Sequence, residues 1–169
     1  MSEGSSSSSN ASRRAARYRE GPRNASVMLV GQNPGREEVK QGRPFVGRAG
    51  KYLDAVLRAR GMERKAFYIT SVVKEPTPGN RKPTAEEIER WMPCLEREIR
   101  EVRPEVMVLM GRVAWKAPRF KGIEVIETYH PAAAMRFPRI REVFEKDMEK
   151  LADIIRKRKL AGTGFLKGQ

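Results

Sequence analysis

A short polar turn near the start of the chain holds the first side chain suited to chemistry. Asn33 lies in the segment Gly31-Gln-Asn-Pro-Gly35, directly after an apolar run that predicts a buried strand. An amide held there can accept a proton of a water molecule and direct the water's lone pair at a target carbon. The alternative is an asparagine that serves the turn itself, because Asn tolerates left-handed backbone. Position alone favours that alternative.

The single histidine of the chain is the second candidate. His130 ends another predicted strand and precedes Pro131. A neutral imidazole at a strand end can donate a hydrogen bond to an oxygen that gains negative charge during a reaction. It can equally cap the loop through hydrogen bonds, and the residues alone leave both roles open.

An aromatic ring and two carboxylates follow the first turn. Phe45 lies in the glycine-bracketed loop Gln41-Gly-Arg-Pro-Phe-Val-Gly47. Its ring could stack on a nucleobase, which is worth ~1–3 kcal/mol per base. It could also pin the loop to the core, and position alone favours that role. Glu37 and Glu38 are the carboxylates nearest to the turn, and the simpler interpretation is a solvated helix start.

Four segments rich in apolar, β-branched or aromatic residues predict the strands that must position these side chains, at residues 26–30, 66–74, 106–110 and 123–129. Helices are expected at residues 49–60, from the capping box Thr84–Glu87 to Val102, and at residues 138–157. Six residues of the last helix are expected to face inward: Ile140, Val143, Phe144, Met148, Leu151 and Ile155.

Strands that alternate with helices predict a three-layer α/β/α sandwich around a central, mostly parallel four-stranded sheet. In such sheets, ligands bind beyond the carboxyl ends of the strands. We therefore expect one cleft, lined by the turn 31–35, by Ser71 and by the segment Tyr129-His-Pro131.

The overall charge indicates a polyanionic partner. The chain has 169 residues, a net charge of +14 and a pI of about 10.4. Such an excess attracts nucleic acid through Coulomb forces and counterion release. A basic surface without a ligand, or one that binds anionic lipid, would carry the same charge. No apolar run approaches the ~20 residues of a membrane span, and the serine-rich start lacks a signal peptide's apolar segment, so a cytoplasmic protein is expected.

The length fits one domain. Residues 1–24 are expected to form a basic, serine-rich flexible tail, residues 25–160 a catalytic domain, and residues 161–169 a short tail. Cys94 is the single cysteine, so no disulfide can form within the chain, and Cys and His ligands are too few for structural zinc or iron–sulfur. We therefore expect no metal or cofactor. We also expect a monomer.

Five segments together resemble the uracil-DNA glycosylases of the thermostable, iron–sulfur type, known as family four. They occur in matching order and spacing between Met28 and Leu151. The segments are Val30-Gly-Gln-Asn-Pro-Gly35, Gly42-Arg-Pro-Phe-Val-Gly-Arg-Ala-Gly50, Tyr68-Ile-Thr-Ser-Val-Val-Lys74, Pro78-Gly-Asn-Arg-Lys-Pro-Thr84 and Tyr129-His-Pro-Ala132.

The resemblance implies a monofunctional enzyme that flips uracil out of DNA and hydrolyses its glycosidic bond. Phe45 would stack on the base, His130 would donate a hydrogen bond to its O2, and a water held by Asn33 would attack C1′. The remaining base contacts would come from Gly31, Gln32, Gly35 and Ser71. The loop after His130 matches the segment that wedges into the duplex. The expected DNA contacts are Met135 and Arg136 in this loop, and Arg43, Arg48, Lys74 and Arg81 at phosphates.

The chain departs from family four at three places. The four cluster cysteines are missing: two match Ser and Arg near the N-terminus, the third matches Glu75, and the fourth matches about Trp91, which would fill the volume. The Asn-Pro-Gly turn resembles that of the mismatch-specific and single-strand-selective branches of the superfamily, in which the Asn positions the attacking water. This resemblance implies the same role for Asn33, and Glu38 matches an acidic residue that is the alternative in family four. Ser71 replaces the asparagine that reads uracil's edge, which predicts broader base specificity.

Two other functions fit the same residues. One is a glycosylase for another lesion, such as thymine opposite guanine or hypoxanthine. The other is a non-catalytic DNA-binding relative, because both the cluster and the base-reading asparagine are lost. Turnover on a panel of lesions separates these functions.

Overall fold

In a computed structural model that describes residues 17–160, four strands form one parallel sheet. All three neighbouring pairs are parallel, with Gly31 opposite Ser71 and Met110 opposite Thr128. The carboxyl ends of the strands therefore meet at one edge, as the sequence predicts. In sheet order, the strands are β2 (Tyr68–Ser71), β1 (Val27–Gly31), β3 (Val106–Met110) and β4 (Glu124–Thr128).

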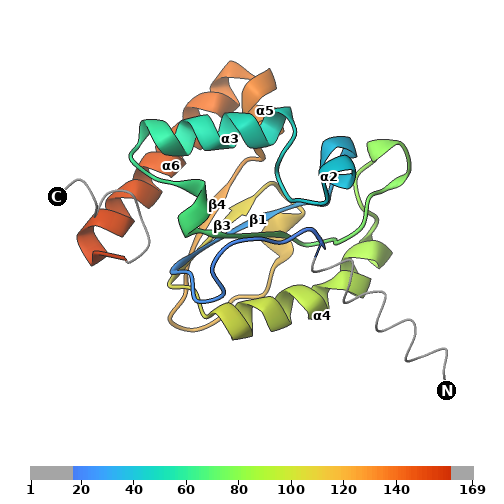
Figure 1. Cartoon of the computed structure of the whole chain (residues 1–169), viewed down its shortest axis with the longest axis horizontal. Coiled ribbons are helices and arrows are strands. Elements are labelled where there is room, and N and C mark those ends of the chain that lie inside the picture. Colours follow the sequence, from blue (N-terminus) through green and yellow to red (C-terminus); the bar gives the residue numbers. More distant parts are fainter. Residues whose placement is uncertain (1–16, 161–169) are drawn as a thin grey trace.

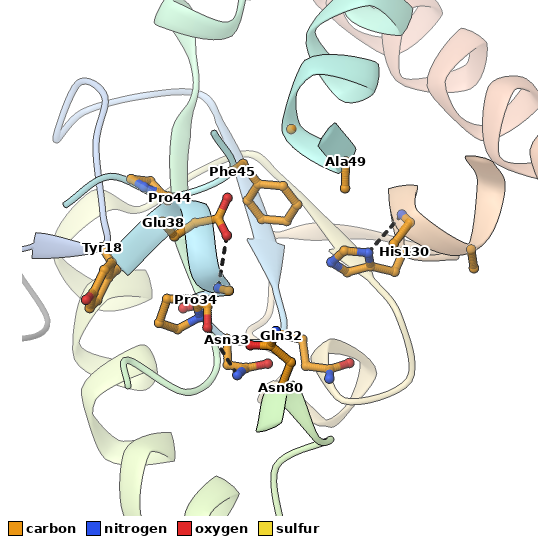
Figure 2. A pocket seen from close by; sticks show the side chains of 15 residues that line it. Tyr18, Gln32, Asn33, Pro34, Glu38, Pro44, Phe45, Ala49, Asn80 and His130 are labelled. Atoms are coloured by element: carbon orange, nitrogen blue, oxygen red, sulfur yellow. Dashed lines mark hydrogen bonds between the residues drawn. The ribbon is translucent and has the colours of Figure 1, made fainter. Parts of the chain in front are cut away.

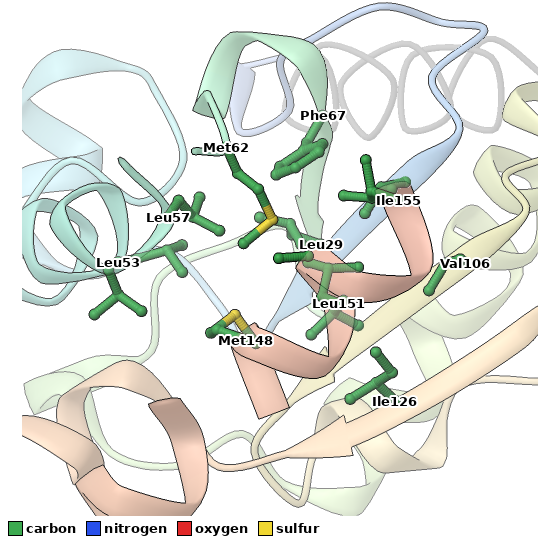
Figure 3. Packing of buried hydrophobic residues seen from close by; sticks show 14 of the residues in the cluster. Leu29, Leu53, Leu57, Met62, Phe67, Val106, Ile126, Met148, Leu151 and Ile155 are labelled. Carbon is green, nitrogen blue, oxygen red and sulfur yellow. The ribbon is translucent and has the colours of Figure 1, made fainter. Parts of the chain in front are cut away.

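Helices cover both faces of this sheet, which confirms the three-layer sandwich (Figure 1). One face carries α3 (Arg48–Ala59), α5 (Pro131–Arg136) and α6 (Pro138–Arg158), and the other carries α4 (Ala85–Val102). Because successive strand residues point to opposite faces, each face has its own hydrophobic cluster. On the first face, side chains of the sheet and of α3 and α6 pack together (Figure 3); they include Leu29, Leu57, Met148 and Leu151.

The long helices match their predicted ranges to within one residue at either end. Glu37 and Glu38 lie in the first turn of α2 (Arg36–Gln41), which agrees with their simpler interpretation as a helix start. The six-residue helix α5 was not predicted, because fewer than two turns give no periodic pattern. Val143 is 44% exposed, so its predicted inward position is wrong; the neighbouring Phe144 faces the core instead. No helix within residues 17–160 is long and apolar enough to cross a membrane. Three 3-10 turns complete the described elements: η1 (Arg64–Ala66), η2 (Pro78–Asn80) and η3 (Ala114–Lys116).

The folded domain begins earlier than the sequence predicts. Tyr18 is 4% exposed, and Glu20 forms an antiparallel bridge with Ile69 of β2. Residues 17–24 therefore do not belong to a flexible tail. The arginines of this segment suggested a solvated arm, but Glu20 pairs with Arg43 and Arg64 of the domain. The other residues of the expected tails, 1–16 and 161–169, lie outside the described residues.

Candidate active site

A cavity of about 430 Å³ opens at the carboxyl ends of β1 and β2, where the cleft was predicted (Figure 2). We call it the base pocket. Gly31 lies under its wall, where a side chain would collide with the Phe45 ring at 2.4 Å. Seven of the predicted site residues line it: Gln32, Asn33, Gly35, Glu38, Phe45, Ser71 and His130.

Glu38 joins the first turn to the loop that carries Phe45. Its carboxylate accepts hydrogen bonds from the backbone N–H groups of Gly35 at 2.9 Å and of Val46 and Gly47 at 2.8 Å each. Such charge-assisted bonds are about twice as strong as neutral ones. Three of the roughly four acceptor positions of a carboxylate are thereby occupied. Glu38 is thus mainly a clamp that fixes the shape of the pocket.

Phe45 forms a wall of the pocket in an unusual backbone conformation. Its φ is +48°, and left-handed backbone costs a non-glycine residue about 1–2 kcal/mol. The guanidinium of Arg64 stabilises this conformation by donating to the carbonyl oxygens of Pro44 and Phe45. Gly50 is required beside it, because a Cβ at Gly50 would lie 2.0 Å from the Phe45 oxygen. The role of Arg64 was not predicted, because nothing in the sequence indicates that it contacts the loop that carries Phe45.

The imidazole of His130 is stacked on the Phe45 ring, with ring centroids 5.6 Å apart and an interplanar angle of 25°. His130 is the N-cap of α5, and its Nδ1 accepts a hydrogen bond from the Ala132 N–H at 3.0 Å. Burial lowers the pKa of His130 to about 4, although the nearby Glu38 charge raises it slightly. The ring is therefore neutral at pH 7 and carries its proton on Nε2. The capping role that the sequence left open is therefore observed at Nδ1. The role as a donor through Nε2 stays a prediction.

Three side-chain amides line the pocket, those of Gln32, Asn33 and Asn80 (Figure 2). The Asn33 Nδ2 makes only long contacts, 3.4 Å to the Pro34 carbonyl and 3.5 Å to Thr77 Oγ1. Asn80 enters from η2, is exposed, and has no hydrogen-bond partner for its side chain within residues 17–160. Asn80 was not predicted as a site residue. The sequence feature that could have identified Asn80 is the Pro78-Gly-Asn segment. A Pro/Gly turn that follows a parallel strand lies near the carboxyl edge of the sheet, where the site is expected.

Ser71 lies in the pocket wall but is 5% exposed. Its hydroxyl donates to the Val73 carbonyl at 2.8 Å. The hydroxyl proton is therefore already used by the backbone, and only the oxygen's lone pairs face other partners.

Lys74 does not contact solvent, so its predicted contact with DNA phosphate is wrong. Its ammonium lies 2.5 Å from the Glu98 carboxylate of α4 and donates to Thr70 Oγ1 at 2.7 Å and to the Ser71 carbonyl. Tyr68 donates to the same carboxylate at 2.6 Å, and burial together with the Glu98 charge raises the pKa of its hydroxyl. We call Tyr68, Thr70, Lys74 and Glu98 the ionic network. In the sequence, Lys74 ends a predicted strand and precedes a polar loop, so an exposed side chain was expected. The sequence does not show that Glu98, on a distant helix, is its partner.

The other predicted DNA contacts differ in their availability. Arg43 and Arg81 are paired with Glu20 at 2.9 Å and with Glu87 at 2.7 Å, which weakens their attraction for phosphate. Arg48 is exposed at the start of α3. The segment after His130 was expected to be a loop but forms the helix α5. In this helix Met135 is half-buried, whereas Arg136 is exposed with its guanidinium 5.3 Å from the centre of the Phe137 ring.

A parallel α/β sandwich whose cavity lies at the carboxyl edge of the sheet belongs to the class of α/β proteins that bind ligands at this edge. The chain belongs to the uracil DNA glycosylase superfamily, whose profile matches residues 18–152. It is similar to type-4 uracil-DNA glycosylases. The relative from Archaeoglobus fulgidus is 37% identical over 82% of this chain and 81% of its own length. The one from Pyrobaculum aerophilum is 39% identical over 76% and 78%, and the one from Sulfurisphaera tokodaii is 37% identical over 80% and 72%.

Proposed function

We propose that this protein is a monofunctional glycosylase that flips uracil out of DNA and hydrolyses its N-glycosidic bond. The superfamily and the names of the relatives support the reaction class. The observation that carries the proposal is the pair of stacked rings in the base pocket: Phe45 offers a face for the base, and the adjacent His130 offers a neutral N–H.

The chemistry follows from these positions. When the bond from C1′ to the base nitrogen breaks, its electrons move into the uracil ring and negative charge grows on O2. The Nε2–H of His130 donates a hydrogen bond to this oxygen and stabilises the departing anion. The sugar becomes positively charged, and a water adds to C1′ and loses a proton to the solvent. The uracil anion takes up a proton, and the products are free uracil and an abasic site.

The side-chain amides of Asn33 and Asn80 are better placed than the Glu38 carboxylate to hold the water. Glu38 uses most of its acceptor positions in the clamp, while Asn33 has only long contacts and Asn80 has no protein partner among the described residues. An amide oxygen accepts a hydrogen bond from the water and so directs the water's lone pair toward C1′.

The test uses a labelled duplex with one G·U pair. Uracil release is measured as strand cleavage after alkaline treatment, which breaks DNA at abasic sites. Release by the wild type, and its near absence in His130→Ala, are expected. DNA binding without release would favour the second function, a non-catalytic relative.

Specificity broader than uracil is part of the proposal. Ser71 offers the base no donor, because its proton goes to Val73, whereas an asparagine amide would offer both a donor and an acceptor. A wrong base is rejected because it leaves polar groups of the site without hydrogen-bond partners. A site with fewer such groups therefore rejects a wrong base less strongly. We expect activity on uracil and on at least one of hypoxanthine or thymine opposite guanine, and Ser71→Asn should narrow this range. Background rates on every lesion except uracil would refute it.

The residues at the family-four cluster positions do not fit an iron–sulfur cluster. Glu75 forms an ion pair with Arg90 at 3.4 Å, and the Trp91 indole is buried in the hydrophobic cluster under α4. Burial raises the pKa of the half-buried Cys94 thiol, which disfavours the thiolate that iron requires. Within residues 17–160, no three His, Cys, Asp or Glu residues are grouped to hold a metal. Purified protein should be colourless, and stoichiometric iron would contradict this.

A further inference from the structure

A second cavity of about 360 Å³ lies beside the base pocket. Gly35 and Asn80 line both cavities, so the two share a wall. The second cavity lies between α2 and the loop that contains η2, which approach each other at the carboxyl edge of the sheet (Figure 1). No role assigned so far uses this cavity.

The lining of the second cavity combines positive charge with apolar surface. Arg36 and Lys40 of α2 are exposed, and no carboxylate is among the lining residues. Arg36 has no ion pair within the described residues, and Lys40 pairs with Glu37 at 3.5 Å. Because that pair is well exposed, it holds Lys40 only weakly. Val39 lies between the two cations at 43% exposure and faces a cavity whose other side includes Pro76.

This chemistry fits one nucleotide of a DNA strand. A phosphate is attracted by the two cations, and a sugar or base edge covers the apolar side chains. The shared wall suggests the path of the DNA strand. If a flipped base fills the base pocket and the strand runs past Gly35 or Asn80, the neighbouring nucleotide reaches the second cavity.

We propose that the second cavity binds the nucleotide adjacent to the flipped one on the same strand. Its phosphate lies at Arg36 and Lys40, and its sugar or base lies against Val39. The inference rests on the proposed function, because it needs a flipped nucleotide in the base pocket. It makes the enzyme sensitive to what flanks the uracil, even in single-stranded DNA.

The experiment compares three single-stranded pentanucleotides of thymidine that contain one deoxyuridine, placed first, in the middle or last. All three have the same length and charge, but a terminal deoxyuridine lacks a neighbour on one side. For the wild type, kcat/KM should fall about tenfold for one of the two terminal positions, as expected when charge-assisted contacts are lost. The side on which it falls identifies the bound neighbour.

The double variant Arg36→Ala, Lys40→Ala should lose about tenfold in kcat/KM on the substrates that have this neighbour and little on the one that lacks it. Val39→Ser should show the same pattern with a smaller loss. The matched control, Arg58→Ala with Lys65→Ala, removes two exposed cations at the opposite edge of the sheet and should affect all three substrates equally.

An equal loss on all three substrates by the cavity variant would mean that Arg36 and Lys40 act only through overall charge, which overturns the inference. So would wild-type rates that do not depend on the position of deoxyuridine. Absence of uracil release by the wild type from both these substrates and the G·U duplex would instead refute the proposed function.

Discussion

The base pocket and the ionic network lie on opposite sides of the same strand and use polar side chains in opposite ways. Thr70 and Ser71 are consecutive in β2; the first belongs to the network and the second lines the pocket. In the network, the Lys74 ammonium has three partners and the Glu98 carboxylate is bonded by lysine, tyrosine and threonine. In the pocket, the His130 Nε2–H and the Asn80 amide have no partner within residues 17–160.

This difference in hydrogen bonding indicates that the ionic network stabilises the fold, whereas the base pocket serves the reaction. A buried polar group without a partner costs about 1–3 kcal/mol, so the interior network must be complete. A binding site needs the reverse, because hydrogen-bonding capacity that the protein satisfies itself is no longer available to a ligand. Removing a network member should therefore affect folding, and removing a pocket member should affect the reaction.

The largest expected effect is that of Lys74→Met on stability. It leaves the Glu98 carboxylate, 2% exposed, without its counter-ion. Breaking a buried pair in this way costs about 3–5 kcal/mol of unfolding free energy, measurable by urea denaturation. Adding Glu98→Gln removes the stranded charge and should restore part of the loss. A single variant as stable as the wild type would contradict the role of the network.

His130→Ala should mainly slow the reaction and affect the unfolding free energy less. Loss of one donor to a developing anion lowers the rate ~100-fold or more, seen as single-turnover uracil release at saturating enzyme. The variant also loses a helix cap, which costs ~0.5–2 kcal/mol. His130→Asn keeps a capping side chain and separates the two effects: it should be nearly as stable as the wild type and still slow. Equal rates in wild type and both variants would exclude His130 from the reaction.

Asn33→Ala and Asn80→Ala should each lower the single-turnover rate roughly tenfold, the effect of one lost hydrogen bond to the water. Glu38→Gln tests the clamp, since an amide nitrogen cannot accept the backbone N–H bonds. We expect it to weaken substrate binding and thermal stability more than the chemical step. If its single-turnover rate instead falls below that of both asparagine variants, Glu38 holds the water.

The smallest expected effect is that of pH. Because burial lowers the pKa of His130 to about 4, the ring is neutral throughout the range from pH 5 to pH 8. The wild-type single-turnover rate should therefore be nearly flat over that range and should fall only as pH drops toward 4. The stability contribution has the same sign: it is full above the unfolded pKa of ~6.5 and is lost as pH falls from there. A rate inflection near pH 6.5 would show that His130 titrates as a solvated imidazole.

Local pattern was enough to predict the sheet, its parallel pairing and the edge at which the site forms. The two central strands, β1 and β3, are uninterrupted apolar runs, and parallel topology brings distant turns such as Asn33 and His130 to one edge. What failed depends on contacts between segments far apart in sequence. The burial of Lys74 depends on Glu98 of α4, and the role of Arg64 depends on two carbonyl groups before α3. Charged residues in such positions look solvated until the partner's location is known.

The bridge between Glu20 and Ile69 also bears on self-association. β2 is an edge strand, and the unpaired N–H and C=O groups of an edge are a template for pairing with another molecule. Glu20 occupies both backbone groups of Ile69, at 2.8 Å and 3.1 Å, and places its carboxylate and its two arginine partners beside that edge. A chain shortened to begin at residue 25 would uncover this template and lose Tyr18 from the pocket wall. The segment that looks most dispensable in the sequence thus covers part of the edge at which one molecule could extend its sheet into the next.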